Sequence, residues 1–348
     1  MFFAFVATII LSGIHFPGMM GLLCSTSLLV GLGILDDFHE LSAWPRFVGQ
    51  IMAAVAMYFV GGISIENLGA LFGEGDVVLG PVALPFTVFA TVGVINAFNM
   101  IDGIDGLAGG LSLISILFFS FLAGLGDHHT DLVMLMLLGA AIVAFLLFNL
   151  RFPGRPFALV FMGDAGSMFL GFMLCWFAVG LSQGEHRAMA PVTALWILAV
   201  PLFDTLSVMI RRLTNGKSPF IADRGHLHHM LMERLPTKRP QLDQQQTIQH
   251  NISSTIIIIF TLAVVLGLIG VTLDILGVSE VASLLLFLAI FGVYLRLTIH
   301  AERLRVLMTR RWLSRRSPTE KHAKLRLPSV TTFPPRFTVR LPQSPGQE

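Results

Sequence analysis

The chain has 348 residues, of which 54% are hydrophobic and 13% charged, and its mean hydropathy is +0.77. Soluble proteins average about 25% charged residues, so this composition excludes an ordinary soluble domain and indicates a polytopic membrane protein. The net charge of +2 needs no nucleic-acid partner to explain it, and we expect none.

Apolar runs long enough to cross a bilayer, about 17 to 25 residues, recur along the chain. A shorter run at 2–14 comes first; it lacks a basic start and a cleavage site, so it is interpreted as a partial helix and not as a signal peptide. The pattern predicts an all-α fold of about ten transmembrane helices. The nine longer runs cover residues 18–35, 44–62, 79–98, 107–124, 131–149, 158–181, 189–210, 253–273 and 279–299.

The basic residues indicate the orientation, because short loops rich in Lys and Arg stay in the cytoplasm. If the loop after residue 35 is cytoplasmic, 22 of the 23 basic residues fall on that side and only Arg187 on the other. We therefore expect a multi-pass membrane protein. Its transmembrane domain would span 1–300, with a large cytoplasmic loop at 211–252 and a basic, disordered cytoplasmic tail at 301–348.

Four segments carry unusual polar residues to the predicted cytoplasmic face. An isolated carboxylate in hydrocarbon is costly, so these acids are wet, paired or hold a cation. Their convergence is typical of an active site at a membrane surface. The segments are "GILDDF" with Asp36 and Asp37, "NAFNMIDGIDGLAGG" with Asn96, Asn99, Asp102 and Asp105, "VFMGDAGS" with Phe161 and Asp164, and "SPFIADRGHLHH" with Arg224, His226, His228 and His229.

Each segment also has a plainer interpretation. Paired aspartates after a helix are often a solvated turn, and the glycines around Asp102 and Asp105 could make a tight reversal. Asp164 could be a helix N-cap. Asp204, about two turns before Arg211, could pair with a cation inside a span. Cys24 and Cys175 lie in apolar runs without metal-ligand spacing and are interpreted as packing residues.

The chemistry of the four segments together is more specific. Clustered carboxylates without cysteines favour Mg²⁺, which works with one or two carboxylates and substrate phosphates. The histidine segment suggests recognition of an anion, with a metal site as the weaker option. A remaining aspartate could orient or deprotonate an attacking oxygen. These residues predict phosphoryl transfer to a lipid. A transporter or channel would instead carry ionisable residues deep in several spans.

The four motifs, in this order over residues 18–300, resemble those of the polyprenyl-phosphate N-acetylhexosamine-1-phosphate transferases, glycosyltransferase family 4. The context "APVTALWILAVPLFDTLSVMIRR" and the short "HLHH" resemble the branch that uses UDP-N-acetylglucosamine more than the branch that uses a UDP-muramoyl-pentapeptide. The resemblance implies transfer of N-acetylglucosamine 1-phosphate to undecaprenyl phosphate with Mg²⁺ or Mn²⁺. This would be the first membrane step of a surface polysaccharide such as O antigen, at the inner membrane. The sequence leaves a homodimer open.

The resemblance also implies roles for the residues that match the motifs. Asp164 matches a metal ligand, and Asp36 and Asp37 match a pair assigned to metal contact or to the lipid phosphate. Phe161 occupies the place associated with packing on uracil. The predicted catalytic residues are Asp36, Asp37, Asp164, His228 and His229, the first three also as metal ligands; the predicted substrate-binding residues are Asn96, Asn99, Asp102, Asp105, Phe161, Arg224 and His226.

The beginning of the chain departs from the family pattern. Family members have a further transmembrane helix and a basic, glycine-rich cytoplasmic segment before the point that matches Met1. We expect a misassigned start or a truncated form. The alternatives are therefore an inactive lipid-binding or scaffold homologue, and a transferase for another UDP-N-acetylhexosamine. A CDP-alcohol phosphatidyltransferase is the nearest rival enzyme, but its aspartate and glycine spacing does not occur here.

Overall fold

The computed structural model describes residues 1–39, 41–71, 73, 75–151, 155, 157–216, 225–235 and 244–314. Within these residues the regular elements are helices, and the one isolated β-bridge joins Asn67 and Val78. The elements are α1 (Phe2–Ser12), α2 (Met19–His39), α3 (Ala43–Phe59), η1 (Gly80–Val82), α4 (Ala83–Ile101), α5 (Leu107–Leu125), α6 (His129–Asn149), α7 (Gly163–Ser182), α8 (Pro191–Ile197), α9 (Ala199–Thr214), α10 (Leu227–Arg234), α11 (Gln244–Ile275) and α12 (Glu280–Ser314).

The chain divides into two units, Met1–Thr298 and Ile299–Glu348. The first unit holds α1 to α11 and most of α12. In the second unit, the described residues 299–314 continue α12, so the predicted tail begins as helix. Its remainder, 315–348, lies outside the described residues, as do 217–224 and 236–243 of the predicted loop 211–252.

All nine predicted apolar runs coincide with helices, and the all-α prediction is confirmed. The predicted count of about ten spans is not. Among the described residues, seven helices are long and apolar enough to cross a membrane, and an eighth span results if the bent pair α8 and α9 counts as one. That pair bends by 80° at Leu198, whose φ of −97° and ψ of 12° interrupt the helix. Helix α1, predicted as a partial helix, has 11 residues, and α3, predicted as a full span, has 17.

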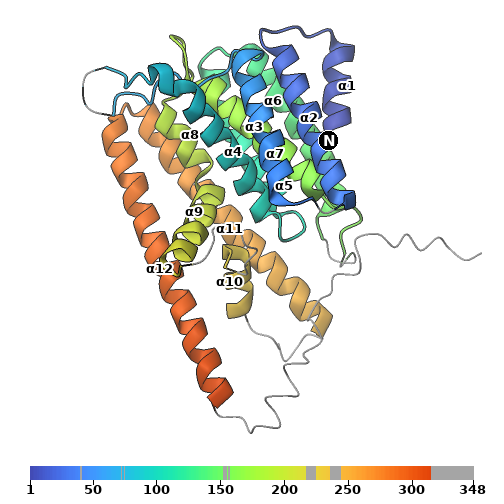
Figure 1. Cartoon of the computed structure of the whole chain (residues 1–348), viewed down its shortest axis with the longest axis vertical. Coiled ribbons are helices and arrows are strands. Elements are labelled where there is room, and N and C mark those ends of the chain that lie inside the picture. The colour runs from blue at the N-terminus through green and yellow to red at the C-terminus, as the bar shows by residue number, and fades with distance from the viewer. Residues whose placement is uncertain are drawn as a thin grey trace, which may run out of the picture. The chain divides into compact units, whose positions relative to one another are not determined.

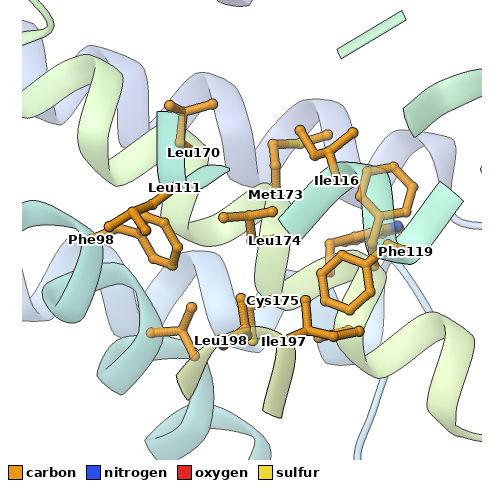
Figure 2. Close-up of a cluster of buried hydrophobic side chains, with 14 of the residues drawn as sticks. Phe98, Leu111, Ile116, Phe119, Leu170, Met173, Leu174, Cys175, Ile197 and Leu198 are labelled. Atoms are coloured by element: carbon orange, nitrogen blue, oxygen red, sulfur yellow. The ribbon is translucent and has the colours of Figure 1, made fainter. Parts of the chain in front are cut away.

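Helix α7 is central in the first unit. In the apolar membrane-length stretch of α7, 83% of the residues are buried, whereas in that of α12 only 17% are. Leu170, Met173 and Leu174 pack between Phe98 of α4 and Phe119 of α5 (Figure 2). Because α7 is surrounded in this way, a polar residue at its first turn lies among the ends of several helices.

The two cysteines have different environments. Cys175 on α7 is buried in this core (Figure 2), which confirms the prediction that it packs. Cys24 on α2 is exposed, so the same prediction is wrong for Cys24. Both lie in apolar runs, and the composition of a run does not tell which face of a helix meets the core.

Close approach of α2 to α7 sets the position of the first acidic pair. Helices α2, α4 and α7 lie side by side (Figure 1). At Gly33 of α2, an added Cβ would overlap the backbone of Ala165 on α7. Small residues permit such contacts between membrane helices. Asp36 and Asp37 follow within about one turn, so they reach the beginning of α7.

Candidate active site

Asp37 and Asp164 meet at the first turn of α7. The Oδ1 atom of Asp37 accepts the backbone N–H of Asp164 at 2.9 Å, and its Oδ2 atom lies 3.5 Å from the backbone nitrogen of Ala165. The first N–H groups of a helix have no partner within it and favour a nearby anion. Asp37 therefore caps α7 from a neighbouring helix, and the plain N-cap interpretation of Asp164 does not describe this turn.

Asn99 on α4 orients the Asp164 side chain. Its Nδ2 atom donates to Asp164 Oδ1 at 2.7 Å and to Ser167 Oγ at 2.9 Å. No described residue hydrogen-bonds to the other carboxylate oxygen, Oδ2. Asn96, about one turn earlier on α4, donates instead to Gln50 Oε1 on α3 at 2.6 Å. Asn99 and Asp164 thus come together, while Asn96 joins α4 to α3.

These oxygens bear on the predicted magnesium ion. Among the described residues no three His, Cys, Asp or Glu side chains form a group that could hold a metal by themselves. Mg²⁺, however, usually takes one or two carboxylates and completes its shell with water and substrate phosphates. The free oxygen of Asp164, beside a second carboxylate at Asp37, fits that donor set once a diphosphate is present.

Asp36 contacts the start of α3. It is 4% exposed, accepts the backbone N–H of Leu41 at 2.7 Å and pairs with Arg46 at 3.1 Å. Both of its oxygens are therefore engaged between α2 and α3. Its predicted role at the metal stays a prediction, and the contacts seen here are those of a structural ion pair.

The reversal between α4 and α5 carries the second acidic pair. Asp105 pairs with Arg151 at 2.6 Å, and Asn149 Oδ1 accepts the backbone N–H of Gly106 at 2.6 Å. Asp102 ends α4 and is half-buried. Asp105 therefore ties this reversal to the end of α6, as the plainer interpretation of the glycines suggested.

Phe161 lies just before α7. It is 70% exposed, so its ring can receive a flat partner, and its predicted contact with uracil stays a prediction. Arg224 lies outside the described residues.

The histidine segment forms the start of α10. His226 is the residue before the helix, and its Nδ1 atom lies 2.8 Å from Asp204 Oδ2. His229 faces the neighbouring ring of His228, with ring centroids 4.2 Å apart. Asp204 was expected to pair with a cation on its own helix, and the contact seen is with this histidine from another element.

His228 lies against the reversal between α4 and α5. It is 1% exposed, and a Cβ added at Gly103 would overlap its ring. Neither ring nitrogen has a hydrogen-bond partner among the residues that the structure describes. Burial, followed by the charges of His229 and His226 and opposed by Asp204, lowers the His228 pKa to about 3. The buried ring is therefore neutral near pH 7, and α10 reaches the Asn99 to Asp105 segment through it.

Sequence reasoning missed several residues that hold the site together. Ser167 shares the Asn99 amide with Asp164, and its place three residues after Asp164 on one helix could have indicated it. The signal for Arg151 and Arg46 was weaker, because a basic residue near a helix end is usual in membrane proteins. Gln50 and Asn149 gave no signal beyond being polar within apolar runs.

A separate cavity lies at the other end of α5. Its volume is about 620 Å³, and its lining includes Leu125, Arg187, Asp274 and Glu280. Leu107, next to the Asp105 reversal, begins α5 and Leu125 ends it, and a helix rises about 1.5 Å per residue. This cavity is therefore remote from Asp164.

Known proteins match this chain over most of its length. Residues 19–182 match the glycosyl transferase family 4 profile. An undecaprenyl-phosphate alpha-N-acetylglucosaminyl 1-phosphate transferase from Salmonella typhi is 38% identical over 286 residues, which are 82% of this chain and 74% of the relative. Proteins of the same name from Haemophilus influenzae and Yersinia pestis are 37% and 36% identical, covering 87% and 78% of this chain and 80% and 71% of the relatives. The chain thus belongs to glycosyl transferase family 4.

Proposed function

We propose that this protein transfers N-acetylglucosamine 1-phosphate from UDP-N-acetylglucosamine to undecaprenyl phosphate, releasing UMP. The observation that carries the proposal is the setting of Asp164, which Asn99 from α4 orients while Asp37 from α2 caps the same turn. The names of the relatives give the lipid acceptor and the transferred group of those proteins, and this chain carries four motifs that resemble those of the family.

The reaction exchanges one phosphoanhydride bond for another. An oxygen of undecaprenyl phosphate attacks the phosphorus that carries the sugar, a new P–O–P bond forms, and the bond from that phosphorus to the oxygen of UMP breaks. The electron pair leaves with UMP. A phosphate monoester oxygen is already a fair nucleophile near neutral pH, so alignment and charge stabilisation contribute more than removal of a proton.

The side chains divide this work by their contacts. Asp164 offers one free carboxylate oxygen, with Asp37 beside it, and these two residues would hold Mg²⁺ or Mn²⁺. The bound ion would supply charge neutralisation for the donor diphosphate. Asp36 is a further candidate for the lipid phosphate. His226, His228 and His229 would approach the sugar-diphosphate, and Asn99, Asp102 and Phe161 the nucleotide.

The orientation of the chain supports a site at the cytoplasmic face of the bacterial inner membrane. In the positive-inside arrangement, 22 of 23 basic residues fall on the side of Asp164, and positively charged loops stay cytoplasmic. UDP-sugars are made in the cytoplasm, which agrees with that side. The lipid product would begin a surface polysaccharide of the O-antigen kind.

A transfer assay tests the proposal directly. The purified chain in lipid nanodiscs is given undecaprenyl phosphate and labelled UDP-N-acetylglucosamine, with Mg²⁺ or with a chelator, and the Salmonella typhi relative serves as the positive control. We expect labelled lipid and equimolar UMP with Mg²⁺ only. UDP-N-acetylgalactosamine is run alongside. Faster transfer from UDP-N-acetylgalactosamine would mean that this nucleotide sugar, and not UDP-N-acetylglucosamine, is the donor. A membrane-inserted chain that makes no product from either donor would support the alternative of an inactive scaffold homologue.

A further inference from the structure

Helix α9 presents an acid and a base on one face toward the beginning of α10. Asp204 and Arg211 are seven residues apart, about two turns, so they share that face. Both are buried, at 1% and 4% exposure. The guanidinium of Arg211 donates to the carbonyl oxygen of Gly225, just before the residues that Asp204 contacts. The start of α10 is therefore held by α9 from both sides.

Asp204 makes two contacts to this segment. Its Oδ2 atom lies 2.8 Å from His226 Nδ1, and its Oδ1 atom accepts the backbone N–H of Leu227 at 2.7 Å. The hydroxyl of Tyr294 on α12 donates to the same Oδ1 at 3.4 Å. A buried carboxylate is tolerated when hydrogen bonds satisfy it. One side chain thus caps α10 and fixes the ring that precedes it.

The contact determines the tautomer of His226. An ionised carboxylate only accepts hydrogen bonds, so the proton of the imidazole must be on Nδ1. The other nitrogen, Nε2, has no hydrogen bond to any described residue. Fixing one ring nitrogen in this way is the usual means of orienting a functional histidine. The free nitrogen is then the atom that can meet a ligand.

The contacts of Asp204 with His226 and Leu227 also determine where His228 lies. His228 is two residues after His226, and its ring packs on Gly103 in the reversal between α4 and α5. Displacement of the first turn of α10 would remove that contact. Asp204 therefore acts on both ends of the histidine segment, although it belongs to a different helix.

We propose that Asp204 is a positioning residue for the transfer reaction. It sets the Nδ1–H tautomer of His226 and anchors α10, so that the unprotonated Nε2 of His226 can accept a hydrogen bond from a hydroxyl or the amide N–H of the donor sugar. The role of His226 toward the donor rests on the proposed function, whereas the tautomer and the anchoring of α10 do not.

The tautomer is tested by ¹⁵N NMR of histidine-labelled protein in detergent, with His226→Ala to assign the signal. In Asp204→Asn one amide oxygen remains for Leu227, and the amide NH₂ faces the ring, so we expect His226 to change to the Nε2–H form. The matched control is Asp131→Asn, which disrupts the His128–Asp131 pair, 3.3 Å apart, at the start of α6. An Nδ1–H signal that persists in Asp204→Asn would overturn the proposal.

A double-mutant cycle tests the consequence for transfer. We expect Asp204→Asn to lower kcat/KM for the nucleotide sugar by about 10 to 100-fold, the usual range when an orienting partner is lost. In the His226→Ala background the same substitution should cost nothing further, because its effect passes through His226. Asp131→Asn should transfer at the unaltered rate. Effects of Asp204→Asn and His226→Ala that simply multiply would indicate a purely structural role and contradict the proposal.

The two readouts separate failure of this proposal from failure of the proposed function. An unaltered chain without transfer activity counts against the proposed function, and the tautomer measurement still decides the role of Asp204. If Asp204→Asn does not insert, Asp204→Glu replaces it in both experiments. Glutamate keeps an acceptor for the ring, so the Nδ1–H tautomer should persist while the added methylene shifts the ring and lowers transfer. A tautomer change in that variant would overturn the proposal.

Discussion

The acids at the Arg187 end of the helical unit and the pair Asp37 and Asp164 at the other end have different partners. At the Arg187 end, which comprises Arg187, Asp76 and Glu280, the arginine pairs with Asp76 at 3.3 Å and with Glu280 at 2.9 Å. At the Asp164 end, Asp37 and Asp164 are held by neutral donors, a backbone N–H and the Asn99 amide. Neutral donors orient a carboxylate without cancelling its charge. The comparison teaches that a carboxylate paired with an arginine stabilises the fold, whereas a carboxylate held by neutral donors can still bind a cation.

Whether the partner is an arginine or a neutral donor also divides the four predicted site aspartates whose partners are known. Asp36 and Asp105 pair with arginines, whereas Asp37 and Asp164 form no ion pair among the described residues. An exposed ion pair contributes little, but a buried acid that loses its cation is costly. Asp36 and Asp105 are thus expected to matter first for stability, and Asp37 and Asp164 for chemistry.

The largest effect should come from Asp164→Asn. The amide keeps the shape and removes the charge, so we expect transfer to fall by about 10³-fold, as for loss of a group that stabilises developing charge. Initial rates with labelled donor measure this. Arg187→Ala, at the other end of the unit, is the control and should transfer normally. Equal losses in the two variants would erase the distinction between the ends.

Asn99→Ala should have the next largest effect. It leaves the Asp164 carboxylate in place but removes the donor that orients it, so we expect a loss of about 10 to 100-fold. The loss should be accompanied by a higher Mg²⁺ concentration for half-maximal rate. Titration of the rate with Mg²⁺ measures both quantities. A lower rate with an unchanged Mg²⁺ dependence would mean that Asn99 does not act through a metal at Asp164.

Asp36→Asn and Asp37→Asn compare the two uses of a carboxylate within one pair. Asp36→Asn leaves Arg46 without its partner, so the free energy of unfolding should fall by about 1 to 3 kcal/mol. Asp37→Asn keeps an oxygen for the backbone N–H of Asp164, so the unfolding midpoint should change less while transfer falls. Thermal unfolding in detergent and the transfer rate are measured together. Greater destabilisation by Asp37→Asn would contradict the assignment.

Acid should loosen α10 through His228. The folded pKa of about 3 lies below the ordinary value of about 6.5, so the undocked segment binds the proton more readily. Docking is fully stable above pH 6.5 and weakens as the pH falls toward 3, by at most about tenfold per pH unit. Hydrogen exchange of residues 227–234, corrected for intrinsic rates, measures this between pH 8 and 5. His228→Gln should remove the part of the pH dependence of exchange that protonation of His228 causes. The same pH profile in this variant and in the unaltered chain would contradict a role for His228.

The sequence predicted the spans well because an apolar run of sufficient length is a local signal. It placed Asn99, Asp37 and Asp164 on one predicted face, and the structure brings these three residues into contact. It could not predict that Asp36 and Asp37, adjacent in the chain, turn to different helices. That choice depends on the close approach at Gly33, a tertiary contact without local signal. The bend of 80° between α8 and α9 was missed for the same reason, since the apolar run continues through Leu198.

The pairing of Asp204 with His226 was also beyond sequence reasoning. The two residues are 22 positions apart, and Arg211 on the same helix face seemed the nearer cation. The histidine motif indicated anion recognition, but its orientation depends on an acid that no motif marked. Buried groups that orient a site are harder to recognise from sequence than groups that contact a substrate.

Where the nucleotide sugar binds is the central claim, and photolabelling tests it most directly. A photoreactive analogue of UDP-N-acetylglucosamine is crosslinked to the unaltered chain, excess unlabelled donor serves as competitor, and the labelled peptides are identified by mass spectrometry. We expect competed label on peptides that contain residues 96–106 and 161–168. Competed label confined to the Arg187 cavity, residues 187–190 and 274–281, would contradict the account.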